Sequence, residues 1–123
     1  DEADSLLSVL KGTVEKVKRL LQDPVQTEFV IVTLPEAMVI DETLRLAKDL
    51  RSFGIKTRHL IVNHLLPSKT SCTFCQSRRE EQDRYLQRIR KDFGNLEMTE
   101  VNLRPTEVRG VKALTELAGE IFS

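Results

Sequence analysis

At 123 residues, the chain has the length of a single domain. Its 19 basic and 19 acidic residues give a formal net charge of zero, so charge provides no reason to expect nucleic acid or an anionic membrane surface as a partner. No apolar run approaches the roughly 20 residues of a membrane-spanning helix, and the acidic first four residues are unlike a secretion signal. We therefore expect a cytoplasmic protein without a membrane span.

The first predicted element is an amphipathic helix over residues 5–22. Its apolar residues recur at helical spacing, and Leu7, Val9 and Leu20 widen the stripe beyond one packing face. The inner positions of the stripe, which would suit an ordinary core helix, are Leu10, Val14 and Val17. Asp23-Pro24 should end the helix, because proline cannot continue the backbone hydrogen-bond ladder.

Three short runs rich in apolar and β-branched residues predict three strands. They cover residues 29–34, 59–63 and 98–103. The runs are continuous or nearly so, which is typical of parallel strands covered on both faces. The sequence therefore predicts helices above and below one sheet.

A helical pattern follows each strand. The first ends at Phe53, where Gly54 is expected as the C-terminal cap. The second covers residues 76–93, with an apolar seam of Tyr85, Leu86, Ile89 and Phe93. The last is marked by Val111, Leu114, Ala118 and Ile121. Strands that alternate with helices, without hairpin turns, predict right-handed crossovers and an α/β fold with a parallel sheet.

Polar residues follow the predicted strands, at the edge where parallel sheets bind ligands. The amide of Asn63 offers a donor and an acceptor, as the edge of an adenine ring requires, although a strand-end cap would also explain it. Arg109-Gly110 could place a guanidinium near an anion at a helix start, or could be a surface arginine and a loop glycine. Glu36 could belong to this edge or simply to the first turn of a helix.

The sequence contains no phosphate-binding loop. No segment has the form GxxxxGK[ST], and the five glycines stand singly. We therefore assign no catalytic residues and expect this chain by itself to be inactive as an ATPase.

Cys72 and Cys75 form a CxxC motif. Two thiolates supply half of the tetrahedral shell of zinc. His59 or His64 of the same chain could complete it, or a second copy could add two thiolates across a two-fold axis. A redox pair and inert thiols are the alternatives; the expected position of the motif after a loop, rather than after a strand, disfavours the redox pair.

Several segments, in order along nearly the whole chain, resemble one protein family. They are residues 23–24, 27–32, 42–46, 61–66, 72–79 and 107–110. They are similar to the ArsA-like ATPases, P-loop NTPases of the SIMIBI type with a deviant Walker A motif, and in particular to the branch that delivers tail-anchored membrane proteins. The resemblance implies that the phosphate loop, both switches and the Mg²⁺ site lie upstream of this sequence. Residues 25–123 would then be the C-terminal portion of the ATPase α/β domain, and residues 1–24 part of a client-binding helical subdomain.

The resemblance also implies roles for single residues. Asn63 matches an asparagine that contacts adenine, and Glu36 matches a glutamate close to the nucleotide at a dimer interface. The loop that wraps the base corresponds to a segment that includes Asn102, Leu103 and Arg109. The family usually has proline at the position of Asn102, which puts the match around the base in doubt.

The implied function is that of a homodimeric ATPase that binds ATP. Cys72 and Cys75 match a pair that holds one zinc ion between two subunits. The implied partners are the hydrophobic tail-anchor helix of a client and a membrane receptor or pump subunit. One alternative is an arsenite-stimulated ATPase that drives an arsenical pump. The other is a non-catalytic dimerisation module held together by zinc.

Overall fold

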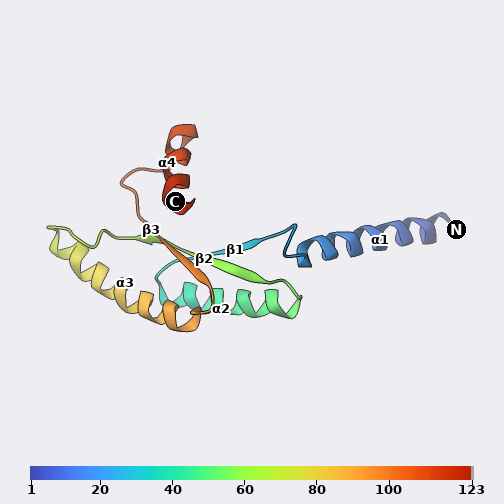
Figure 1. The fold of residues 1–123 in the computed structure, drawn as a ribbon, viewed down its shortest axis with the longest axis horizontal. Helices are drawn as coiled ribbons and strands as arrows, with labels where there is room; N and C mark the ends of the chain where they lie inside the picture. Colours follow the sequence, from blue (N-terminus) through green and yellow to red (C-terminus); the bar gives the residue numbers. More distant parts are fainter. Residues whose placement is uncertain (123) are drawn as a thin grey trace.

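A computed structural model gives the arrangement of the chain and describes residues 1–122. The elements are α1 (Glu2–Gln22), β1 (Phe29–Thr33), α2 (Ala37–Ser52), β2 (Thr57–Leu65), α3 (Thr73–Asp92), β3 (Glu97–Asn102) and α4 (Gly110–Phe122). The strands form one parallel sheet in the order β1-β2-β3. Helices α2 and α3 lie on one side of the sheet and α4 lies on the other (Figure 1). The predicted α/β fold, with helices on both faces of a parallel sheet, is confirmed.

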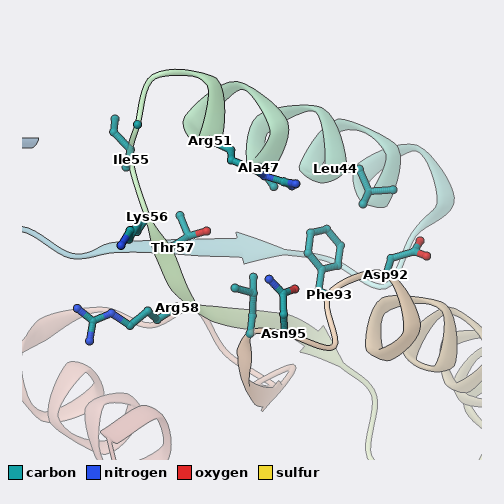
Figure 2. Close-up of a pocket in the computed structure, with 12 residues that line it drawn as sticks. Leu44, Ala47, Arg51, Ile55, Lys56, Thr57, Arg58, Asp92, Phe93 and Asn95 are labelled. Atoms are coloured by element: carbon teal, nitrogen blue, oxygen red, sulfur yellow. The ribbon is translucent and has the colours of Figure 1, made fainter. Parts of the chain in front are cut away.

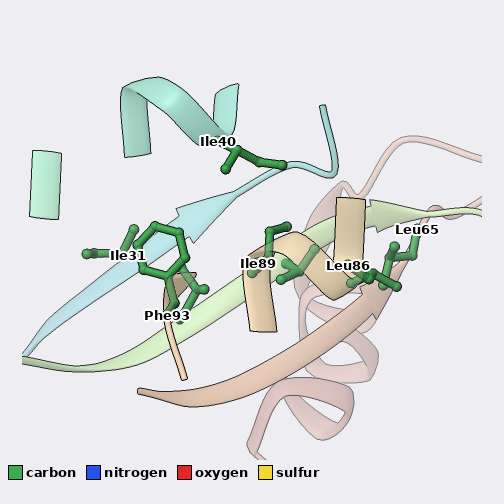
Figure 3. Packing of buried hydrophobic residues seen from close by; sticks show 8 residues of the cluster. Ile31, Ile40, Leu65, Leu86, Ile89 and Phe93 are labelled. Atoms are coloured by element: carbon green, nitrogen blue, oxygen red, sulfur yellow. The ribbon is translucent and has the colours of Figure 1, made fainter. Parts of the chain in front are cut away.

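The core lies between the sheet and the helices α2 and α3. Leu60 and Val62, two residues apart on the central strand, are fully buried on this face. The cluster, shown in part in Figure 3, consists of Ile31, Ile40, Leu60, Val62, Leu65, Leu86, Ile89 and Phe93. The apolar seam predicted for α3 is thus confirmed. Burial of one such side chain contributes about 1.5–3 kcal/mol, so this cluster is the main source of cohesion between the sheet and the two helices.

A buried pair of hydroxyls also joins α2 to β1. Thr43 donates to the carbonyl of Val39 at 2.7 Å. Its single hydroxyl proton is thereby used, so the hydroxyl of Thr33, 2.7 Å away, must donate to Thr43. Both hydroxyls are satisfied, which offsets the cost of burying them beside the core.

Helix α2 ends in a turn that requires glycine. Gly54 has a φ of 73°, and the N–H of Ile55 donates to the carbonyl of Leu50 at 2.9 Å, as in a Schellman motif. Gly54 is therefore the cap residue that the sequence predicted. The amide of Gln22 donates to the carbonyl of Phe53 at 2.6 Å and ties the end of α1 to this turn.

An extra residue interrupts the pairing of β2 with β3. The pairing advances three residues on β2, from Val62 to Leu65, while β3 advances two. His64 takes up the difference with a φ of 60°, in the left-handed region that costs a non-glycine residue roughly 1–2 kcal/mol. The sequence analysis ended this strand at residue 63, whereas the structure continues it to Leu65. Asn63 is therefore not a strand-end cap but lies inside β2, at a β-bulge.

The sheet face opposite the core is covered over only part of its area. Val101 of β3 is buried on the side of α4, whereas Val30 and Val32 of β1 are 48% and 57% exposed. The expectation that every strand is covered on both faces is therefore wrong for β1 within this chain. Two further exposed residues are Val111 and Leu114 of α4, which belong to the apolar pattern that predicted this helix.

Helix α1 projects away from the sheet (Figure 1), and none of its residues is buried. Leu10, Val14 and Val17 are 57%, 55% and 49% exposed, so the interpretation of these three as core residues is wrong for this chain. The apolar stripe of α1 faces solvent. Across residues 1–122, no helix combines the length and apolar character that crossing a bilayer would need.

Candidate functional site

A cleft of about 500 Å³ opens at the carboxyl end of the sheet, between the bulge in β2 and the segment after β3. Its lining residues are Asn63, His64, Val101, Asn102, Leu103, Arg104, Pro105, Thr106, Glu107, Val108 and Leu117. This volume lies within the range of small-molecule sites. The structure therefore brings together three of the five residues expected to bind nucleotide, which are Asn63, Asn102 and Leu103.

The amide of Asn63 keeps much of its hydrogen-bonding capacity. Its Oδ1 accepts from the backbone N–H of His64 at 2.9 Å. One further lone pair on Oδ1 and the two hydrogens of Nδ2 have no hydrogen-bond partner among residues 1–122. A ligand in the cleft could therefore meet both a donor and an acceptor at this one side chain.

Gln82 of α3 fixes the chain directly after the bulge. Its Nε2 donates to the carbonyl of His64 at 3.1 Å, and its Oε1 accepts from the N–H of Leu66 at 2.9 Å. The N–H of Leu103 donates to the carbonyl of Leu65 at 2.7 Å and joins the two walls of the cleft. The sequence analysis did not single out Gln82, because nothing distinguishes it from the other polar residues of this helix.

Glu120 of α4 holds the other wall. Its Oε1 accepts from the backbone N–H of Asn102 at 3.1 Å, and its Oε2 accepts from the guanidinium of Arg104 at 2.9 Å. The Nε of Arg104 is buried and has no acceptor within the described residues. A buried donor of this kind usually has a partner, and a ligand could supply it. No local pattern in the sequence predicts the pairing of Arg104 with Glu120, because these loop and helix residues meet only in the folded chain.

The other two residues expected to bind nucleotide lie outside this cleft. The side chain of Arg109 is 81% exposed and forms an ion pair with Glu107 at 2.9 Å. Glu36 lines a separate cleft of about 270 Å³ together with Arg78 of α3. It is the N-cap residue of α2, with extended backbone and no side-chain capping bond, and not a first-turn residue. Within this chain, neither residue shares a cleft with Asn63.

The two cysteines form the start of α3. Cys72 is the N-cap, and its Sγ accepts from the backbone N–H of Cys75 at 3.4 Å. The sequence analysis began this helix at residue 76, whereas the structure begins it at Thr73. Both thiols are free, and Cys72 is exposed. The motif still follows a loop, residues 66–71, rather than a strand, so the objection to a redox pair stands, although a helix N-terminus stabilises a thiolate.

Cys72 and Cys75 could supply two of the four donors that a zinc site needs. Among residues 1–122, no three or more His, Cys, Asp or Glu side chains gather in a way that could bind a metal ion. His59 lies at the far end of β2, with Nε2 2.8 Å from Glu28 and Nδ1 3.2 Å from Glu97. The hypothesis that a histidine of the same chain completes the site is therefore wrong. Two thiolates suit zinc chemically, but the remaining donors must come from outside this chain.

The two thiols should titrate differently. The backbone N–H of Cys75, and then its thiol, donate hydrogen bonds to the sulfur of Cys72 and lower the pKa of Cys72. The same thiol bond raises the pKa of Cys75, because the donating group must lose its proton to ionise. Cys72 is therefore the thiol that ionises first, at lower pH.

We expect iodoacetamide to alkylate Cys72 before Cys75 in the metal-free chain. Because the thiolate is the reactive form, the rate at Cys72 should rise at lower pH than that of an ordinary cysteine. Peptide mass spectrometry across a pH series measures both rates. The variant Cys75→Ser keeps the backbone donor and should keep most of the effect, whereas equal rates at both cysteines of the unmodified chain would contradict the assignment.

Comparison with known proteins identifies the family. A family model described as anion-transporting ATPase matches residues 1–123. Over 116 residues, or 92% of this chain, it is 43% identical to ATPase GET3C of Arabidopsis thaliana. ATPase GET3B of the same plant is 41% identical over 99% of this chain. ATPase get3 of Schizosaccharomyces japonicus is 34% identical over 89% of it.

The chain spans 30% of the length of the two plant relatives and 34% of the yeast relative. The match nevertheless covers all of the secondary structure described above. The three-stranded parallel sheet and its helices are consistent with a fragment of a P-loop NTPase. The family match and the fold together confirm the resemblance drawn from the sequence: the chain belongs to the anion-transporting ATPase family.

Proposed function

We propose that this chain is the C-terminal part of a cytoplasmic ATPase that couples ATP binding and hydrolysis to the delivery of tail-anchored membrane proteins. The observation that carries this proposal is the solvent-exposed apolar stripe of α1, in a chain whose family and named relatives are ATPases. Because the chain spans about 30% of the length of those plant relatives, the activity is proposed for a longer protein. In that protein, another part holds the triphosphate and Mg²⁺.

The cleft at the carboxyl end of the sheet is the proposed adenine site. Asn63 offers its free donor and acceptor to the edge of the base, while Leu103 provides apolar surface beside it. Asn102 contributes to the wall through the backbone bond to Glu120. Arg109 belongs to the segment that follows β3, and its 81% exposed side chain could turn toward a bound nucleotide.

Glu36 requires a different argument, because it lines a second cleft. Its carboxylate is exposed, and the cleft opens beside the first half of α3. We propose that Glu36 approaches the nucleotide in the homodimer, where a second subunit would bring further groups to this surface. This role is separate from the adenine contact assigned to Asn63.

Helix α1 is the proposed contact for the client. A tail-anchor helix presents about 20 apolar residues that must be kept from water before insertion. The stripe on α1 contains Leu7, Leu10, Val14 and Val17, all at least 49% exposed. An apolar helix lying along such a stripe would cover both surfaces, as in other helix-in-groove complexes.

The cysteines are the proposed zinc clamp of the dimer. Each chain supplies Cys72 and Cys75 at an exposed helix start, and two chains together supply the four thiolates of a tetrahedral site. Zinc then fixes the two subunits at a defined separation. A membrane receptor or pump subunit would bind the assembled dimer.

A second candidate is an arsenite-stimulated ATPase that drives an arsenical pump. The observation that favours it is the same pair of free thiols, of which Cys72 is exposed, because thiolates are soft ligands. Arsenite should then raise ATP hydrolysis by the full-length protein. Without such stimulation, the delivery function remains the better explanation.

In the full-length ATPase, Leu10→Ser combined with Val14→Ser should reduce capture of a fluorescent tail-anchor peptide about tenfold. Both changes remove apolar surface from the stripe, and ATP hydrolysis should be unchanged. The matched control is Val25→Ser with Val111→Ser, two exposed valines outside α1. Equal capture by the α1 variant and the control would contradict the client-binding role.

The adenine contact can be tested by Asn63→Ala in the same protein. Loss of one hydrogen-bonding side chain from the base should raise the KM for ATP roughly fivefold to tenfold, with little change in kcat. Asn95→Ala, at the other end of the sheet, is the control. If both variants had the KM of the unmodified protein, Asn63 would not contact the base.

The zinc clamp can be tested on the chain itself by measuring metal content together with solution mass. A dimer with about one zinc ion per two chains is expected, and Cys72→Ser should give a metal-free monomer. His59→Ala should bind zinc normally, because His59 lies far from the cysteines. A metal-free monomer in zinc-supplemented buffer would rule out the clamp in this chain.

A further inference from the structure

Another cleft of about 500 Å³ lies at the amino end of the sheet, opposite the proposed adenine site. It is formed by the C-terminal half of α2, the connection into β2, and the turn after α3 (Figure 2). The proposed client helix α1 joins the sheet at this end, through Gln22 and Pro24, but none of its residues lines the cleft, and neither does any residue of the proposed ATP site. The cleft is therefore a separate site to be explained.

The inner surface of this cleft is apolar. Phe93 and Leu96 of the turn after α3 face α2 across the cleft, and both belong to or pack against the core cluster. The apolar lining residues are Leu44, Ala47, Ile55, Phe93 and Leu96. All of these side chains except Ile55 belong to the core cluster or pack against it, so most of the inner surface is preformed.

The rim of the cleft is cationic. Arg51, Lys56 and Arg58 line it, and no salt bridge to any of them occurs within residues 1–122. Asp92 is the one carboxylate among the lining residues. Its Oδ2 lies 3.4 Å from Nε of Arg88, and this ion pair offsets part of its negative charge. Since the chain as a whole has no net charge, this is a local excess of positive charge.

The three cations come from two elements at the rim, and Lys56 and Arg58 extend outward, away from Phe93. Figure 2 shows Arg51 extending from α2 into the space beside Phe93, while Lys56 and Arg58 project from the start of β2. Arg58 donates to the carbonyl of Pro24 at 3.2 Å, a bond that leaves the other guanidinium hydrogens free. A ligand would therefore meet an apolar surface flanked by unpaired cations.

We propose that this cleft binds an acidic peptide segment of a partner protein. An apolar side chain of that segment packs on Ala47 and Leu96, which are half-buried, and carboxylates on either side pair with Arg51, Lys56 and Arg58. A simple anion would leave the apolar surface unused, and an apolar ligand would leave three cations unpaired. A peptide that carries both groups complements charge and apolar surface together.

The probe is a fluorescein-labelled peptide in which two leucines alternate with glutamates, titrated into the 123-residue chain by fluorescence anisotropy. Saturable binding is expected, with amide shifts in NMR spectra confined to residues 44–58 and 92–96. Arg51→Gln with Lys56→Gln should weaken binding about tenfold. Lys48→Gln with Lys69→Gln makes the same charge change outside the cleft and should leave the Kd unchanged.

Further peptides and competitors separate this site from simpler explanations. Serine in place of both leucines should weaken binding at least fivefold, and so should glutamine in place of the glutamates. Absence of saturable binding, equal effects of the two double variants, or undiminished binding of the serine peptide would overturn the proposal. So would displacement of the probe by succinate or by phosphatidylserine vesicles at equal charge concentration, which would indicate a small-anion site or a lipid surface.

Discussion

The extra residue in β2 is the constraint on which the site depends. Side chains alternate along a strand, so Leu60 and Val62 point into the core, and Leu65 would point away from it in a regular strand. His64 absorbs one residue in the left-handed region and returns Leu65 to the core, while Asn63 lines the cleft. Hydrogen bonds from Gln82, each worth about 0.5–1.5 kcal/mol, offset the cost of this backbone.

Much of the fold follows from local patterns in the sequence. Short apolar runs predicted the three strands, and the seam with Leu86 and Ile89 predicted the helix that covers them. The start of α3 was missed because a cysteine N-cap gives a weaker signal than serine or aspartate. The exposure of α1 was missed for another reason: an apolar stripe predicts burial but does not say whether the covering surface belongs to the same chain.

The site was only partly predictable. Asn63 was expected at this edge because ligands bind at the carboxyl ends of parallel strands, whereas Asn102 was expected there only from the family resemblance. Glu36 also follows a strand at this edge. It lines a different cleft from Asn63, and residues of α3 form the other wall of that cleft. Gln82 and Glu120 could not be predicted, because each acts through bonds to distant backbone or loop groups that leave no periodic pattern.

The carboxylate of Glu120 also makes the last helix more than a cover for the sheet. It accepts hydrogen bonds from the end of β3, at Asn102, and from the following loop, at Arg104, so one side chain ties α4 to both parts of this cleft wall. Val111, near the start of that helix, is 82% exposed and accessible to another molecule. Replacing the one carboxylate of Glu120 would deprive two donors of the wall, the N–H of Asn102 and the guanidinium of Arg104, of this acceptor at once.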